Sequence, residues 1–139
     1  MAGLTDSRSA AAARPRGRAI AYWATTALLA AEMLVGGMWG ILQIPYTRDM
    51  MQHLGYPDYF NVLLGVWYAL GAVALLVPGF PRLKEWAYAG ATFVYTGAIV
   101  SHLAVHDHLR MLVAPLFFLS LTCASWALRP ARRRLTTQR

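Results

Sequence analysis

The chain has 139 residues, of which 58% are hydrophobic and 14% are charged. Because an ordinary soluble domain carries about 25% charged residues and a disordered chain combines low hydrophobicity with high charge, this composition argues against both classes of protein. The formal net charge is +7, and the single cysteine, Cys123, leaves no pair for an intramolecular disulfide or a Cys-x-x-Cys redox motif.

Four apolar segments follow a polar, arginine-containing stretch over residues 1–18, which we interpret as a disordered cytoplasmic tail. The segments cover residues 19–44, 59–77, 86–105 and 111–128. Their lengths lie between 18 and 26 residues, and about 20 apolar residues suffice for a helix to span the bilayer core. The first segment is too long for the apolar region of a signal peptide, and no cleavage motif of the A-x-A type follows it. The pattern therefore predicts four membrane-spanning helices.

The distribution of the basic residues predicts the orientation of these helices. With four spans both chain ends lie on one side, and this side carries eleven of the 13 lysines and arginines. Only Arg48 and Arg110 lie on the other side. By the positive-inside rule both termini are cytoplasmic. We expect the basic tail over residues 129–139 to contact anionic lipid head groups rather than nucleic acid, because no folded nucleic-acid-binding motif accompanies it. Residues 19–128 are then expected to form an all-α, antiparallel four-helix bundle in the membrane.

The longest connection between these segments, residues 45–58, predicts a short helix on the outer membrane surface. Thr47 can cap the start of this helix and Gly55 can end it. Met50 and Leu54 lie on one face, so that face can rest on the apolar part of the bilayer.

One acid, Glu32, lies near the middle of the first segment. A carboxylate at that depth costs on the order of 2–3 kcal/mol, so we expect Glu32 to face the bundle interior. Trp39, Gly36 and Gly40 share its helix face, and the G-x-x-x-G pair lets another backbone approach closely. Glu32 is then either a structural acid bonded to a neighbouring helix or a residue that binds a ligand or handles a proton, with Trp39 beside it.

Hydroxyl and imidazole groups follow one face of the third segment. Tyr95 and His102 are seven residues apart, and Tyr68 and Ser120 in the neighbouring segments lie at the depth of Glu32. If these side chains converge, they form a pocket with one acid, several hydroxyls and aromatic walls, which suits a quinone-like ring ligand better than a bare ion. If they do not converge, the tyrosines are core residues with satisfied hydroxyls.

Three histidines lie at the end of the third segment and just beyond it. His102 and His106 are four residues apart, a spacing at which two imidazoles can share a metal ion, and Asp107 can orient an imidazole. The H-E-x-x-H glutamate and a cysteine partner are lacking, so we predict no metal site. His102 is interpreted as a ligand contact or proton relay, with an interfacial or loop histidine as the alternative.

Short sequence blocks along the segments carry a family resemblance. They are AYWATT at residues 21–26, HLGYP at 53–57, LGVW at 64–67, GAVALLVP at 71–78, PRLKEWAYAG at 81–90, TGA at 96–98 and SHL at 101–103. In order and spacing they resemble the DoxX-like family of small bacterial integral membrane proteins. This resemblance implies a four-helix protein of the bacterial cytoplasmic membrane, and the family's name comes from a subunit of quinone-linked sulfur oxidation.

These observations predict an accessory or quinone-interacting subunit of a membrane redox system. Glu32 would manage a proton, while Tyr68, Tyr95 and His102 would contact the ligand. The sequence requires no cofactor, and a quinone is the ligand that the resemblance favours. One alternative is a non-enzymatic membrane partner or assembly protein, whose glycine face docks another subunit or a second copy. Another is a stand-alone intramembrane enzyme acting on a lipid or a secondary metabolite.

Overall fold

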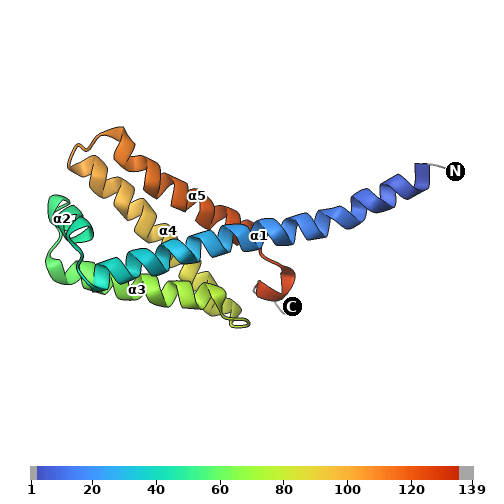
Figure 1. The fold of residues 1–139 in the computed structure, drawn as a ribbon, viewed down its shortest axis with the longest axis horizontal. Helices are drawn as coiled ribbons and strands as arrows, with labels where there is room; N and C mark the ends of the chain where they lie inside the picture. Colours follow the sequence, from blue (N-terminus) through green and yellow to red (C-terminus); the bar gives the residue numbers. More distant parts are fainter. Residues whose placement is uncertain (1–2, 135–139) are drawn as a thin grey trace.

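The computed structural model describes residues 3–134 of the chain and, among their side chains, those of residues 16–131, 133 and 134. The described residues form helices and connecting turns, with no strand among them (Figure 1). The elements are α1 (Gly3–Ile41), α2 (Pro45–His53), α3 (Asp58–Leu76), α4 (Pro81–Ala104), η1 (Leu109–Leu112), α5 (Val113–Leu128) and η2 (Ala131–Arg133). The predicted all-helical fold is therefore confirmed.

Within the part of the chain that the structure describes, three helical stretches are long and apolar enough to cross a membrane. They are Arg16–Ile41 within α1, Asp58–Leu76, which is α3, and Leu109–Leu128, which joins η1 to α5. The fourth long helix, α4, has 24 residues but a more polar sequence. It carries Lys84 and Glu85 in its first turns, and tyrosines, threonines and a histidine further along.

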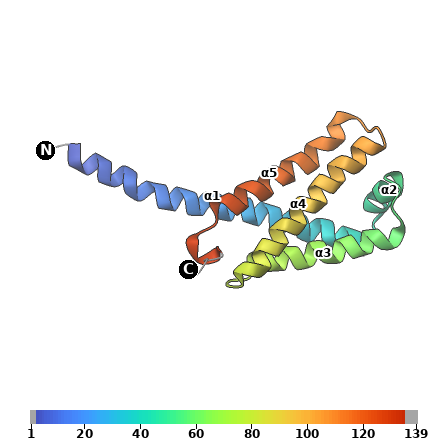
Figure 2. The ribbon, with the colours of Figure 1, turned by 180° about the vertical axis from the view of Figure 1, so that it is seen from behind.

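The four long helices run antiparallel to their neighbours in the chain (Figure 1). The helix pairs in contact are α1 with α3, α3 with α4, α4 with α5, and α5 with α1, which closes a ring of helices. Helix α2 lies at one end of the bundle, near the connection between α4 and α5, and we call this the α2 end. The turn between α3 and α4 and the start of η2 lie at the opposite end, from which α1 projects (Figure 2). We call that end the terminal end.

Helix α1 begins earlier than the sequence pattern predicts. A disordered tail is expected over residues 1–18, whereas the helix already starts at Gly3 and runs through Pro15. The alanine-rich sequence before Pro15 has high helix propensity. Because nucleation is the costly step, a helix anchored in the apolar segment extends into such a sequence at little further cost. Residues 1 and 2 lie outside the described part of the chain.

The short helix of the first connection is present, but its start differs from the prediction. Helix α2 begins at Pro45, whose fixed backbone suits the first helical position, and no side chain caps it. Thr47 instead donates hydrogen bonds to the carbonyls of Trp39, at 3.1 Å, and Ile44, at 3.2 Å, which closes the turn between α1 and α2. The predicted end is confirmed, because Gly55 takes a left-handed conformation with a φ of 83° just after α2.

Helices α1 and α3 pack backbone to backbone through glycines. A Cβ atom added to Gly37 would lie 2.8 Å from the carbonyl oxygen of Gly65, and one added to Gly40 would lie 2.8 Å from that of Asn61. A Cβ at Gly36 would only reach ordinary contacts. The glycine face of the first segment is therefore covered by α3 of the same chain.

Beside this contact lies a core to which α1, α3 and α4 contribute. Its buried members are Leu29, Ala30, Met33, Ala72, Leu75, Tyr88, Ala91 and Tyr95. Phe118 and Leu119 of α5 pack against this core. A chain of hydroxyls adds a polar link between helices, because Ser125 of α5 bonds to Thr26 of α1 and to Tyr88 of α4, both at 2.7 Å.

A buried lysine closes α3 at the terminal end of the bundle. The ammonium group of Lys84 is fully buried and donates to the carbonyl oxygens of Ala74, at 2.7 Å, Leu75, at 3.1 Å, and Val77. These carbonyls belong to the last turn of α3, whose own helical hydrogen bonds run out there. Lys84 therefore serves as a cationic cap for the end of a neighbouring helix.

Two arginines after α5 contact the protein, although the basic tail over residues 129–139 is expected to contact lipid head groups. Arg129 is 3% exposed and its guanidinium lies 2.7 Å from the Glu85 carboxylate. Arg133 is 8% exposed and donates to the Tyr22 hydroxyl at 3.2 Å. The partners of both arginines, Glu85 and Tyr22, come from helices distant in the chain. The order of charges along the sequence therefore does not predict these contacts. Residues 135–139 of the tail lie outside the described residues.

Candidate functional site

The intramembrane acid is held by a tyrosine from across the bundle. Glu32 of α1 is half-buried and faces the interior, and the hydroxyl of Tyr95 on α4 donates a hydrogen bond to its carboxylate. Tyr95 is 3% exposed. Among the described side chains, the ion pairs involve Arg48, Arg129 and two histidines, and none includes Glu32. A hydroxyl rather than a cation therefore partners this carboxyl group.

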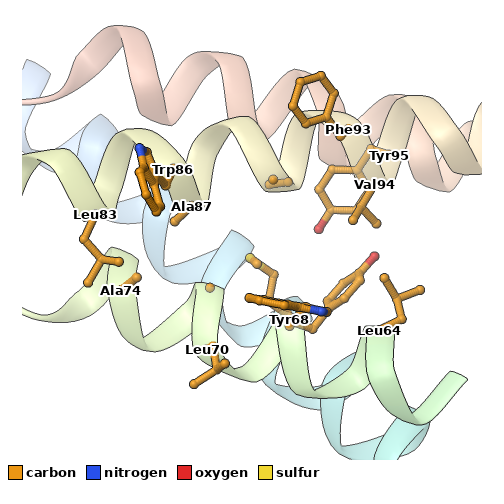
Figure 3. A pocket seen from close by; sticks show the side chains of 15 residues that line it. Leu64, Tyr68, Leu70, Ala74, Leu83, Trp86, Ala87, Phe93, Val94 and Tyr95 are labelled. Atoms are coloured by element: carbon orange, nitrogen blue, oxygen red, sulfur yellow. The ribbon is translucent and has the colours of Figure 1, made fainter. Parts of the chain in front are cut away.

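A second tyrosine completes the site. The ring of Tyr68 on α3 meets that of Tyr95 edge to face, with centroids 6.3 Å apart and an interplanar angle of 89°. Phe118 of α5 stacks on Tyr95 at 5.8 Å. Tyr95 is thus fixed by aromatic contacts from two helices, and the hydroxyl groups of both tyrosines point into the space between α3 and α4 (Figure 3).

This space is an apolar cavity of about 390 Å³ between α3 and α4, which we call the α3–α4 groove. Tyr68 and Tyr95 line one part of it and bring in the hydroxyl groups. The aromatic side chains of Trp67, Trp86 and Phe93 also line it, and these residues are 62%, 77% and 74% exposed. The groove therefore combines a wide, exposed aromatic rim with a polar region next to Glu32.

A smaller cavity of about 130 Å³ lies between α1, α2 and α3, and we call it the α2 cavity. Gly36 and Gly40 of α1 line it, together with Thr47 of α2. Asn61 of α3 is 3% exposed and donates to the Thr47 hydroxyl at 3.3 Å across the cavity wall. Tyr68 lines both this cavity and the α3–α4 groove, so the two spaces meet at its ring.

Two of the residues expected at the site lie elsewhere. Trp39 is 42% exposed and packs edge to face on Tyr46, with centroids 6.1 Å apart, and it lines neither cavity. Ser120 is exposed and bonds to the carbonyl of Leu116 in its own helix. The expected convergence therefore holds for Glu32 with the two tyrosines and fails for these side chains.

The histidine expected at the ligand belongs to a separate cluster at the α2 end. Nδ1 of His102 lies 2.7 Å from the Asp107 carboxylate, and Nε2 of His53 lies 2.8 Å from its other oxygen. Hydrogen bonds to His102 and then His53 hold the pKa of Asp107 below its ordinary value. Tyr56 bonds to Ser101 at 2.8 Å nearby. The cluster ties the segment around α2 to the end of α4, and the described residues hold no group of three potential ligands arranged for a metal ion.

The α2 cavity is the part of the site that sequence reasoning missed. Its walls come from α1, α2 and α3, and its polar groups, Thr47 and Asn61, carry no recognisable spacing. Asn61 is the only signal in the sequence, as an amide within an otherwise apolar segment. A single amide of this kind does not predict a cavity unless the rotation of each helix about its axis is known.

Comparison with known proteins supports the fold assignment at the level of a family. A family model described as the DoxX-like family matches residues 24–125, a stretch that includes both cavities and Glu32. No curated protein and no solved structure shows a significant match to the chain.

Proposed function

Because the chain belongs to the DoxX-like family, we propose that it is a four-span protein of the bacterial cytoplasmic membrane. In this proposal both termini are cytoplasmic and the protein is an accessory subunit of a membrane redox system that binds a quinone-like ring ligand. The α3–α4 groove with the Tyr95–Glu32 hydrogen bond beside it is the observation that carries the proposal.

The side-chain directions on α4 support a fourth span. Its polar residues Lys84, Tyr88, Tyr95 and His102 are all buried inside the bundle, whereas apolar residues such as Phe93 are exposed on its outer face. Along most of α4 the polar residues therefore face the bundle interior, and the exposed Arg82 and partly exposed Glu85 lie in its first turns at the terminal end. A helix with this distribution can stand in a bilayer because neighbouring helices satisfy its polar groups.

The distribution of cations supports the orientation. The terminal end of the bundle carries Lys84 near the start of α4 and Arg129 and Arg133 after α5, and the α2 end carries Arg48 in α2 and Arg110 in η1. Lys84, Arg129 and Arg133 are among the eleven of 13 basic residues that lie on the side of the chain ends in a four-span arrangement. By the positive-inside rule the terminal end faces the cytoplasm, which places α2 and its cavity on the outer side.

The groove matches the chemistry of a lipophilic ring with carbonyl oxygens. Its volume lies within the range of about 300–1,000 Å³ that is typical of small-molecule sites. Trp86 and Phe93 at the rim are exposed where lipid would lie, so a ligand dissolved in the bilayer can enter sideways. A ring carbonyl beside Tyr68 can accept a hydrogen bond from the Tyr68 hydroxyl, because the Tyr95 hydroxyl donates to Glu32. Glu32, which is hydrogen-bonded to Tyr95, can donate a proton toward a ring oxygen when another subunit of the redox system supplies the electrons that reduce the ring.

Tryptophan fluorescence tests this binding directly. We would titrate the purified protein in lipid nanodiscs with a short-chain ubiquinone, which quenches tryptophan emission on contact. Saturable quenching is expected. Trp67→Phe and Trp86→Phe should each remove part of it, and the double variant should remove most of it. Trp39→Phe is the control, because Trp39 is also exposed, at 42%, but lies outside both cavities.

A tyrosine variant tests the polar part of the site. Tyr68→Phe removes the hydroxyl that can donate to a ring carbonyl, a hydrogen bond worth about 0.5–1.5 kcal/mol, so the affinity for the quinone should fall by roughly 2- to 12-fold. Quenching that does not saturate, or that survives both Trp67→Phe and Trp86→Phe, would refute quinone binding in the groove.

The two alternatives can be separated from this proposal in one measurement. The docking alternative relied on the glycine face of the first segment, and Gly37 and Gly40 contact α3 within the chain. Native mass spectrometry of the protein extracted gently from its own membranes would show a quinone-mass adduct under the proposal. A stoichiometric second polypeptide without an adduct would instead support the assembly protein, and activity of the purified protein alone would support a stand-alone enzyme.

A further inference from the structure

We propose that the Glu32 carboxyl group exchanges its proton with the aqueous phase at the α2 end of the bundle, through the α2 cavity. In this exchange the O–H bond of the carboxyl group breaks, the carboxylate remains on Glu32 and the proton passes to water in the cavity. The return of a proton from the same water restores the acid. The assignment of this water to the outer side rests on the proposed topology, whereas the path itself rests on contacts within the chain.

Because Gly36 has no side chain, the space between the Glu32 carboxyl group and the α2 cavity is open. Gly36 lines the α2 cavity, and a Cβ atom at this position would lie 3.5 Å from Oε1 of Glu32 and 3.9 Å from the ring of Tyr68. These are ordinary van der Waals distances, so a methyl group would fit and would occupy the space between the carboxylate and the cavity. Glycine leaves this space open.

The α2 cavity has the size and the polar groups to hold a short file of water. Its volume of about 130 Å³ accommodates about four water molecules. The side chains of Asn61 and Thr47 line it and can bind water beside their mutual hydrogen bond. At its outer limit the cavity is lined by Tyr46 of α2, which is 64% exposed. The cavity thus extends from the neighbourhood of Glu32 to the solvent-facing helix α2.

On the side of Glu32 toward the terminal end, closely packed apolar side chains block the passage of water. Between Glu32 and the terminal end lie Leu29 of α1, Ala72 and Leu75 of α3, and Ala91 of α4, which are between 0% and 4% exposed. All four are apolar and belong to one packed core. Water has no polar partner among them, and the buried hydroxyls of Thr26, Tyr88 and Ser125 on this side are bonded to one another at 2.7 Å. A proton leaving Glu32 in that direction would therefore meet a dry barrier. The accessible route therefore leads to one end of the bundle.

Among the described side chains, those of two tyrosines face Glu32 with their hydroxyl groups, and no ion pair includes it. Tyr68 faces it from α3 and Tyr95 from α4, while α5 contributes the apolar ring of Phe118 behind Tyr95. Glu32 is consequently the group in this part of the bundle whose protonation state can follow the pH of the water it contacts.

A one-sided pH step tests the proposal in the full chain without any quinone. The protein is reconstituted in vesicles, with its orientation determined by protease access to the basic C-terminal segment. Time-resolved infrared spectroscopy follows the carbonyl band of the protonated Glu32 carboxyl group, identified by its loss in Glu32→Gln. We expect the band to respond at least tenfold faster to a pH step on the α2 side than to a step on the terminal side.

Two variants and a control make the path specific. Gly36→Ala should slow the response from the α2 side at least tenfold, and Thr47→Val, which removes a hydroxyl from the cavity at almost constant volume, should slow it several-fold. Gly97→Ala is the control, because a Cβ there meets nothing within 4 Å and Gly97 lines neither cavity. Unfolding curves of all variants show that the folds are comparable.

The proposal is overturned if the band responds equally fast from both sides or faster from the terminal side. It is also overturned if the band responds from neither side, or if well-folded Gly36→Ala and Thr47→Val both respond as the wild type does. Because no quinone is present, a failure of quinone binding in the fluorescence titration leaves this result unaffected. The two proposals can therefore fail independently.

Discussion

The contact between α1 and α3 at Gly65 provides a quantitative test of how the bundle is held together. A Cβ atom at this position would lie 2.6 Å from the carbonyl oxygen of Gly37 and 2.8 Å from the backbone nitrogen of Ile41. Both obstructing atoms belong to the backbone of α1, so no side-chain rotation can relieve the clash. We expect Gly65→Ala to force the two helices apart and to destabilise the protein.

The size of the effect follows from the distances. Restoring an ordinary contact of about 3.4 Å to the Gly37 oxygen requires a separation of about 0.8 Å, and a gap of that size forfeits roughly a quarter to a half of the dispersion energy at the interface. Overpacking costs about 1–3 kcal/mol, and a rigid backbone obstacle favours the upper half of this range. Alanine is better than glycine in a helix by about 1 kcal/mol. The expected net loss in the free energy of unfolding is therefore about 1–2 kcal/mol.

Reversible unfolding in mixed micelles, driven by increasing SDS and followed by circular dichroism, measures this difference. The control is Gly97→Ala on α4, where the added Cβ meets nothing within 4 Å. This variant should keep the propensity gain and be up to about 1 kcal/mol more stable than the wild type. If Gly65→Ala were as stable as Gly97→Ala, the backbone contact between α1 and α3 would not determine the packing, and the reasoning would be wrong.

Three further predictions concern polar contacts. Lys84→Met leaves the carbonyls at the end of α3 without their cationic donor, and should lower the free energy of unfolding by at least about 2 kcal/mol; an unchanged SDS titration would contradict the capping role. Ser125→Ala strands two buried hydroxyl groups and should cost about 1–3 kcal/mol in the same titration, whereas Ser120→Ala, at an exposed serine bonded within its own helix, should stay within about 0.5 kcal/mol. For Asp107, a pKa held below the ordinary value of about 3.9 means that the folded state keeps the carboxylate ionised at lower pH than the unfolded chain does. Its stabilising contribution is therefore complete above the ordinary value and is lost as the pH falls through the lower, folded value. The rate of hydrogen–deuterium exchange in α2 should accordingly stay low at every pH above about 4 and increase at lower pH. Asp107→Asn should show fast exchange at every pH. Identical exchange in both proteins would exclude the histidine–aspartate bridge as the tie between α2 and α4.

The sequence by itself determined where the apolar helices lie and how residues are spaced along them, although it did not reveal that α1 begins at Gly3. A run of apolar residues has one low-energy solution in a bilayer, which is a helix with its backbone groups paired internally. Each residue then advances by about 1.5 Å along the axis. The relative positions of Glu32, Tyr68, Tyr95 and Ser120 along their helices therefore follow from counting. The end of α2 just before Gly55 follows from the glycine itself. Family membership is also a property of the sequence pattern and needs no coordinates.

Only the tertiary structure decided which of these depth-matched side chains meet. Rotation about a helix axis is set by contacts with neighbouring helices, and here the approach of Gly37 to Gly65 orients α1 and α3. That rotation directs Glu32 and Tyr68 inward, whereas Ser120 on α5 is exposed. The burial of Arg129 and Arg133 was decided in the same way, because their partners come from helices distant in the chain. The position of a residue along its helix follows from the local sequence. The direction in which its side chain points depends on how several helices pack against one another.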